Sequence, residues 1–124
     1  MTTTVRELTP TELQRFDPTR RFGEGLAPQR REKAWAKLPE LRDVLQKQFG
    51  AMRVVVFGSL AVPDAFTHWS DIDLAVWGIA PDRLYEAVAV LNDLSPGIKV
   101  DLVDAERCHS IALKQIIQEE GIVV

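Results

Sequence analysis

The chain has 124 residues, of which 46% are hydrophobic and 27% are charged, a balance typical of one globular domain. Its 15 basic and 18 acidic side chains give a net charge of −3, which argues against nucleic acid as the main partner. The single cysteine, Cys108, excludes an internal disulfide and a cysteine-based zinc site. No apolar run has the length of a membrane span, and the polar residues 2–4 do not resemble a signal peptide. We therefore expect a cytoplasmic protein that does not contact a membrane.

Residues 1–38 are predicted to form an N-terminal extension of a domain at 39–124. Capping signals at 9–12 indicate a short helix that ends at 17–18. Residues 19–28, with Arg20, Arg21 and the nearby Arg30, predict either a solvated linker or a basic arm that grips a partner or a nucleotide. Residues 29–37 favour a helix with Trp35 as an anchor, and Pro39 is expected to break or restart it.

The following elements are predicted from apolar spacing. Residues 39–49 form a helix that ends at Gly50, 52–57 a buried strand closed by Gly58, and 72–77 a second strand. A helix opens at Pro81, and a third strand spans 98–103. Asp104 is expected to cap the last helix, and residues 122–124 add either a short strand or a docking tail. The last helix is expected to direct four side chains inward: Ile111, Leu113, Ile116 and Ile117. This order predicts an α/β (α+β) fold, a small mixed β-sheet flanked by helices.

Asp71 and Asp73 are two residues apart in the second predicted strand, so their carboxylates point to the same face. One interpretation is a solvated edge strand, but the apolar neighbours Ile72 and Leu74 argue against exposure. Like charges on a buried strand repel unless a cation lies between them, and magnesium prefers such oxygen ligands. The pair therefore indicates a magnesium site.

Asp101 alternates with apolar residues in the third predicted strand and would face the same way if that strand lay beside 72–77. Three carboxylates from two neighbouring strands are typical of a two-metal site. Asp104 is the alternative third carboxylate, but it lies on the opposite face of its strand. Lys99, on the face of Asp101, either pairs with a carboxylate or contacts a phosphate.

Gly58 and Ser59 follow the first strand directly. Glycine lets backbone amides approach a phosphate, and a serine hydroxyl can donate to a phosphate oxygen, although an ordinary turn has the same sequence. In the loop before Asp71, His68 is either a surface residue or a nucleotide or partner contact. Trp69 either packs against the protein or stacks on a base.

These motifs together resemble the nucleotidyltransferase superfamily that includes DNA polymerase β, and most of all its minimal nucleotidyltransferase (MNT) branch. The matching segments are 57–59, 70–76 and 100–103, and the resemblance covers about 39–124. It implies a polymerase β-like fold that uses Mg²⁺ and ATP. Gly58 and Ser59 would then hold the triphosphate, and Asp71 and Asp73 would bind metal. Asp101 would bind the second metal and act as base.

The resemblance also implies a partner. MNT proteins are commonly paired, as antitoxins, with a HEPN-domain RNase toxin, and they transfer AMP from ATP to a tyrosine of that toxin. Two alternatives stay open: a non-catalytic antitoxin that neutralises by binding, and a nucleotidyltransferase acting on a small molecule. The eleven-residue loop 60–70 motivates the first alternative, because it is one residue longer than the family pattern and lacks the usual glycine.

Overall fold

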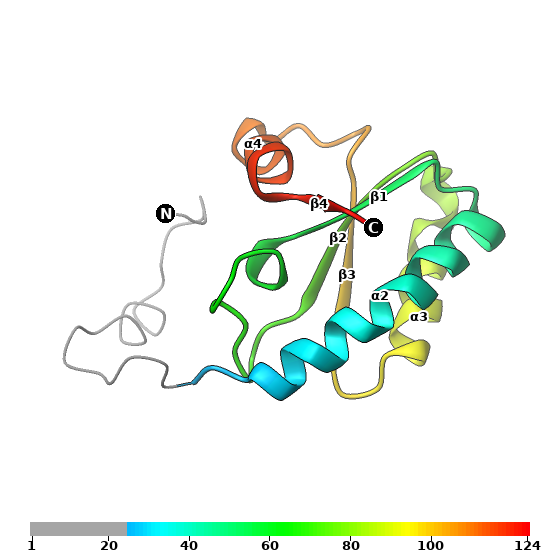
Figure 1. The fold of residues 1–124 in the computed structure, drawn as a ribbon. Coiled ribbons are helices and arrows are strands. Elements are labelled where there is room, and N and C mark those ends of the chain that lie inside the picture. Colours follow the sequence, from blue (N-terminus) through cyan, green and yellow to red (C-terminus); the bar gives the residue numbers. More distant parts are fainter. Residues whose placement is uncertain (1–24) are drawn as a thin grey trace.

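The computed structural model describes residues 25–124, which form a four-stranded sheet in the order β3-β2-β1-β4. The strands are β1 (Arg53–Phe57), β2 (Ile72–Trp77), β3 (Val100–Asp104) and β4 (Ile122–Val123). Helices α2 (Pro28–Phe49) and α3 (Leu84–Leu94) lie on one side of the sheet, and α4 (Ile111–Glu120) lies on the other (Figure 1). A short 3-10 turn, η1 (Gly58–Leu60), follows β1, and a second, η2 (Pro81–Arg83), precedes α3. The predicted fold class is confirmed.

Strand register brings the acidic positions together. β1 pairs with β2 in antiparallel fashion, and Phe57 lies opposite Asp73. β2 pairs with β3 in parallel, with Asp73 beside Asp101. The connection between these parallel strands runs through η2 and α3, as parallel pairs require. β4 pairs with β1 and confirms the short C-terminal strand.

Alternation along the strands separates two apolar clusters. Val54 and Val56 of β1 and Leu74 of β2 point toward α2 and α3, in the larger cluster. Val55 and Ala75 point the other way and pack with Ile117 of α4. Asp73 alternates with Leu74, so it lies on the α4 side of the sheet. The carboxylate face is thus the face that α4 covers in part.

The prediction that Pro39 breaks the helix is wrong, because α2 runs without interruption through this residue. Pro39 is exposed, and the residues that α2 buries recur at helical spacing on the other face: Ala34, Leu38, Leu41, Leu45 and Phe49. A proline inside a helix costs about 3 kcal/mol. Burying a leucine or phenylalanine side chain contributes about 1.5–3 kcal/mol each, so the buried stripe outweighs the local penalty. The division between 38 and 39 falls inside this helix and stays a prediction.

The predicted helix end at Gly50 is confirmed. Gly50 has a φ of 77°, and the Ala51 amide donates to the Leu45 carbonyl at 3.0 Å, the bond of a left-handed helix end. The predictions for residues 1–24, namely the helix at 9–18 and most of the basic loop, lie outside the described residues.

Two predictions about the last helix are wrong. Asp104 ends β3 and binds its own turn, accepting from the Glu106 amide at 3.1 Å. Ser110 caps α4 instead, because a turn separates Asp104 from the helix and the Ser110 hydroxyl accepts the Leu113 amide at 3.1 Å. Ile111, expected to point inward, is the first residue of α4 and is 75% exposed.

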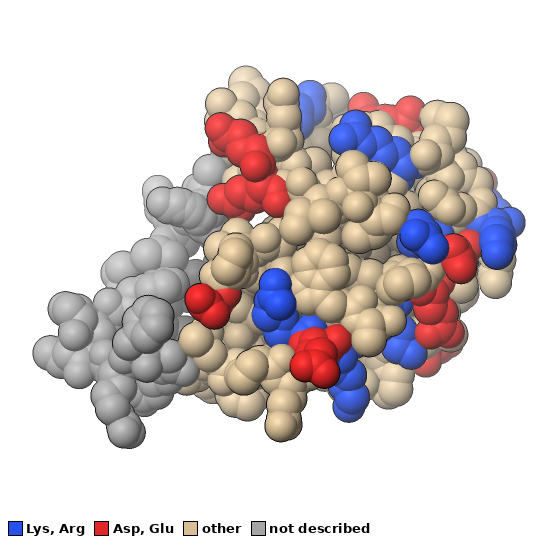
Figure 2. All heavy atoms as spheres, in the orientation of Figure 1, with Lys and Arg blue, Asp and Glu red and all other residues tan. Residues whose placement is uncertain are grey.

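Charged side chains of both signs alternate along α2 on the face that Figure 2 shows. Two pairs bridge at short distance, Lys37 with Glu40 at 3.0 Å and Arg42 with Asp43 at 3.1 Å. Acidic side chains gather over the end of α4, where Glu119 and Glu120 are exposed (Figure 2). Among the described helices, none has the length and apolar character needed to cross a membrane.

Candidate active site

The site begins where β1 ends. Gly58 turns the chain with a φ of 73°, a conformation that side chains other than glycine rarely adopt. A Cβ atom added at Gly58 would lie 2.6 Å from Oδ2 of Asp73. The Asp73 carboxylate therefore rests directly on the backbone of the Gly58–Ser59 turn. The two predicted motifs, a phosphate cradle and an acidic pair, are in contact.

Asp101 is the neighbour of Asp73 in the parallel ladder, so the two side chains leave the sheet on the same face. Neighbouring strands lie about 4.8 Å apart, which sets the two carboxylates side by side. Nζ of Lys99 lies 3.5 Å from Oδ1 of Asp101, so this lysine pairs with a carboxylate as one of the two interpretations expected. Asp104 lies at the far end of β3 and bonds Arg107 at 2.9 Å, which separates it from this group.

Asp71 immediately precedes β2. Partial burial raises the pKa of its carboxyl, and the charge of Asp101 raises that pKa further. Lys99 and Arg30 oppose the rise. Burial and the Asp101 charge both make the ionised form of Asp71 less favourable, and a bound cation would stabilise that form. The repulsion between Asp71 and Asp101 therefore favours a metal-binding role.

The loop 60–70, whose sequence departs from the family pattern, is packed and extensively bonded. Phe66 is buried, with 2% of its surface exposed, and its carbonyl accepts the Ala27 amide at 3.0 Å. Thr67 pairs with Leu26 in an isolated antiparallel bridge, and its amide donates to the Ser70 hydroxyl at 2.9 Å. The buried Phe66 and the backbone bonds on either side of it therefore fix the end of this loop against the start of α2.

Two α2 side chains hold this loop. The indole of Trp35 donates to the Leu60 carbonyl at 3.2 Å, which confirms Trp35 as an anchor. Arg30 donates to the carbonyls of Thr67, at 3.0 Å, and of Ser70. Our sequence interpretation counted Arg30 with a basic arm, and its bonds to the protein's own loop went unpredicted. No local signal identifies them, because the acceptors are 37 and 40 residues away.

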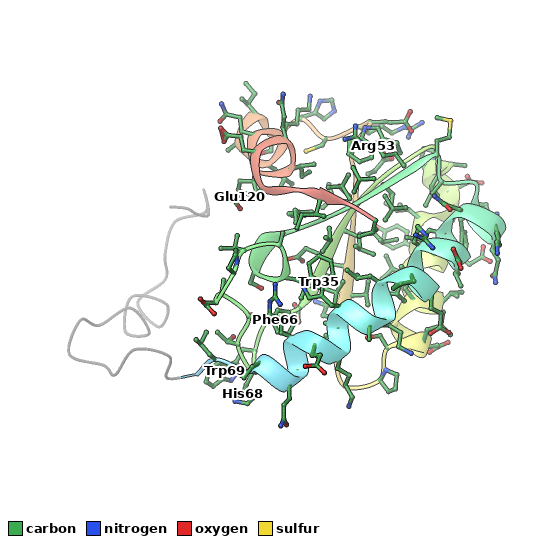
Figure 3. All side chains as sticks on the ribbon, in the orientation of Figure 1. Trp35, Arg53, Phe66, His68, Trp69 and Glu120 are labelled. Atoms are coloured by element: carbon green, nitrogen blue, oxygen red, sulfur yellow. The ribbon has the colours of Figure 1, made fainter. Side chains whose placement is uncertain are left out.

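Figure 3 shows Phe66, His68 and Trp69 near the start of α2, and Arg53 at the opposite end of the sheet. His68 is exposed, and its ring meets that of Trp69 edge-on at 6.2 Å. His68 also lines a groove of about 520 Å³ together with Arg30, Lys33 and the turn at 96–98. None of the three carboxylates lines that groove, so it lies beside the site and is not the site itself.

The residues present fit magnesium bound with a nucleotide better than a closed protein cage. Within residues 25–124, no three His, Cys, Asp or Glu side chains come close enough together to enclose a metal ion. Magnesium is usually held by one or two carboxylates, with water and substrate phosphates as the other ligands. Asp73 and Asp101 side by side, with Asp71 just before β2 and the Gly58 turn against Asp73, meet that requirement. Their role as metal ligands stays a prediction.

The fold is that of the polymerase β-like nucleotidyltransferases. The family described as polymerase beta, nucleotidyltransferase matches residues 39–124, and the chain belongs to this family. The match spans β1, the Gly58–Ser59 turn and the three aspartates.

The chain is also similar to particular proteins. A Methanocaldococcus jannaschii protein named "Putative protein adenylyltransferase MJ1217" is 29% identical over 85 residues, which cover 67% of this chain and 86% of that protein. A crystal structure of a toxin–antitoxin with AMP-PNP matches with a TM-score of 0.55 and 27% identity, over 71% of this chain and 69% of that one. The toxin–antitoxin MntA-HpeT, in a variant with two aspartates two positions apart changed to glutamate, matches with a TM-score of 0.55 and 25% identity over the same shares.

Proposed function

We propose that this chain is an antitoxin that transfers AMP from magnesium ATP to a tyrosine of a HEPN RNase toxin and thereby neutralises it. One observation carries the proposal: Asp73 and Asp101 lie side by side on one face of the sheet, Asp71 precedes β2 within reach of the Asp101 charge, and Asp73 rests on the Gly58 turn. The similarity to a protein named as an adenylyltransferase supports protein as the acceptor. The similarity to a toxin–antitoxin with AMP-PNP supports ATP as the donor and a toxin as the partner. We place the reaction in the cytoplasm, where ATP is available.

In the proposed reaction the phenolic oxygen of the tyrosine attacks the α-phosphorus of ATP. The bond from that phosphorus to the oxygen bridging the β-phosphate breaks, and pyrophosphate leaves with the bonding electrons. Asp101 takes the phenolic proton as general base. Backbone amides of the Gly58 turn and the Ser59 hydroxyl orient the triphosphate. The products are an AMP–tyrosine ester, pyrophosphate and a proton.

Asp71 and Asp73 would hold magnesium with the phosphates, and Asp101 would hold a second ion near the attacking oxygen. A divalent cation supplies charge that neutralises the phosphates and lowers the pKa of an attacking hydroxyl. Asp73 lies in β2 and Asp71 directly precedes it, and the paired strand keeps these positions fixed before the nucleotide binds. The loop 60–70 is bonded to the start of α2 at Phe66 and Thr67, which supports an ordered approach to Asp71 despite its unusual sequence.

The test uses ATP labelled on its α-phosphate, magnesium, and a purified HEPN-domain protein as the candidate acceptor. We expect the label to appear on the HEPN protein, to depend on its acceptor tyrosine, and to disappear with a chelator. The double variant Asp71→Asn with Asp73→Asn should lose labelling at least about 100-fold, because an amide is a poorer magnesium ligand and carries no charge.

The matched control is Asp82→Asn with Asp93→Asn, which removes the same charge from two exposed positions near and in α3. It should label the toxin at the wild-type rate. Labelling that survives loss of Asp71 and Asp73 would refute the mechanism. A double variant that labels nothing but still neutralises the toxin would instead identify an antitoxin that acts by binding. Transfer of AMP to a small acceptor in the absence of the partner would support a nucleotidyltransferase that acts on a small molecule.

A further inference from the structure

Arg30 connects segments that are far apart in the sequence. Its Nη1 donates to the carbonyls of Thr67 and Ser70, and its Nη2 donates to the carbonyl of Gly97 at 3.3 Å. The guanidinium carbon also lies 5.2 Å from the centre of the Phe66 ring. One side chain of α2 therefore contacts both the loop that leads into β2 and the turn that leads into β3.

These two segments place the carboxylates. Ser70 immediately precedes Asp71, and Gly97 lies four positions before Asp101 (101 − 97). β2 and β3 are parallel, so both enter the sheet at the same end, where the Ile72 amide donates to the Lys99 carbonyl at 2.9 Å. The Arg30 bonds join the two entrances a few residues ahead of that first ladder bond.

We propose that Arg30 is a positioning residue that fixes the separation of Asp71 and Asp101 by joining the entrances of β2 and β3. The inference rests on the proposed function in one respect: it takes the ligand of these carboxylates to be magnesium with ATP. Arginine suits this role because its planar fork directs N–H groups to acceptors on different segments at once. Lysine, a single ammonium on a flexible stem, reaches fewer of them.

The fold does not depend on Arg30 alone. The Ala27 amide bonds the Phe66 carbonyl at 3.0 Å, and the His68 amide bonds the Gly25 carbonyl at 3.2 Å. Phe66 also packs in the larger apolar cluster, with 2% of its surface exposed. An Arg30 variant should therefore fold with a looser connection between the two entrances.

The first measurement is backbone hydrogen exchange of the full chain for wild type, Arg30→Gln and Arg30→Lys. The loss of one hydrogen bond shifts a local opening equilibrium about 5-fold, so we expect the amides of Ser70 and Ile72 to exchange at least about 5-fold faster in Arg30→Gln. Arg30→Lys should give an intermediate rate. The control is Arg42→Gln on the same helix, where the arginine pairs with the adjacent Asp43. It should leave both amides unchanged.

The second measurement is calorimetric binding of magnesium α,β-methylene-ATP, an analogue whose α–β bridge cannot be cleaved. Residues that orient metal ligands typically change affinity about 10–100-fold when replaced, so Arg30→Gln should bind at least about 10-fold more weakly than Arg42→Gln. A faster exchange with unchanged nucleotide affinity would make Arg30 merely structural and would overturn the proposal. Unchanged exchange would overturn it as well.

These results are separable from the fate of the proposed function. If the wild-type chain binds the analogue but labels no HEPN protein, the acceptor is wrong while the role of Arg30 is still decided by exchange and affinity. If the wild type labels the toxin and Arg30→Gln matches Arg42→Gln in both measurements, the role of Arg30 is wrong and the proposed function stands.

Discussion

Replacing Gly58 by alanine isolates the contact between the phosphate turn and the acidic pair. At a φ of 73°, a side chain costs about 1–2 kcal/mol in backbone strain. The new Cβ would also lie 2.6 Å from Oδ2 of Asp73, so the carboxylate or the turn must move by roughly half an ångström or more, since a tolerable Cβ contact exceeds about 3 Å. A displacement of about 1 Å at reacting groups can reduce rates about 100-fold. We therefore expect Gly58→Ala to lose about 10–100-fold in AMP transfer.

The matched control is Gly50→Ala. Gly50 has a similar φ of 77°, but the nearest atom to its added Cβ is 4.0 Å away, and it ends α2 far from the aspartates. Both variants should lose about 1–2 kcal/mol, seen as a fall in the melting temperature of about 4–8 °C per kcal/mol. A domain of ordinary stability stays folded after that loss, so unfolding cannot explain a rate difference. Equal transfer rates in the two variants, measured with α-labelled ATP, would refute the contact between turn and carboxylate as a determinant of activity.

Two further predictions concern stability. Gly121→Ala should lower the free energy of unfolding by about 3 kcal/mol, because its Cβ would lie 2.2 Å from the Ile117 carbonyl oxygen and 2.4 Å from Cγ1 of Val55. The melting temperature should fall by about 4–8 °C for each kcal/mol lost, so a value within about 2 °C of wild type would contradict this prediction. Asp71→Asn should melt at a higher temperature than wild type in neutral buffer with a chelator. Burial, and then the charge of Asp101, raise the folded-state pKa of Asp71 above its unfolded value of 3.8, so its ionisation costs stability as pH rises through that folded pKa. The gain should vanish below pH 3.8, where both states are protonated, and a gain that persisted there would refute the electrostatic cause.

The strands and the acidic face could be predicted because their signals are local. Alternation over 72–77 predicted the bounds of β2, which are confirmed, and the face on which Asp73 lies. The position of Asp101 beside Asp73 could be predicted by assuming that β3 is the neighbour of β2, and the register confirms that assumption. Gly50 and the short C-terminal strand were predicted from helix-end and β-branched signals of the same kind.

What could not be predicted depends on distant partners. The carbonyls that bind Arg30 lie 37, 40 and 67 residues along the chain, and nothing near residue 30 indicates them. The choice of Ser110 over Asp104 as helix cap depends on a turn whose length the sequence pattern does not give. Phe66 drew attention as an apolar residue in a loop, but only the fold shows that it lies under the Arg30 guanidinium.

Pro39 is where local rules and tertiary packing disagree most, and it gives the clearest test of helix continuity. The family match begins at this residue, and the sequence places a helix start there, where proline is favourable at the first turn. In the structure Pro39 lies inside α2, where it removes one backbone hydrogen bond. Pro39→Ala should then raise the free energy of unfolding. The gain is about 3 kcal/mol for the relieved helix interior, less about 1 kcal/mol because proline also restricts the unfolded chain.

A net gain near 2 kcal/mol, measured by urea unfolding with an unchanged m-value, supports one continuous α2. A loss of stability in Pro39→Ala would mean that a new helix begins at residue 39. In that case Arg30 and Trp35 would belong to a separate segment, and their hold on the loop at 60–70 would no longer be rigidly tied to the domain core.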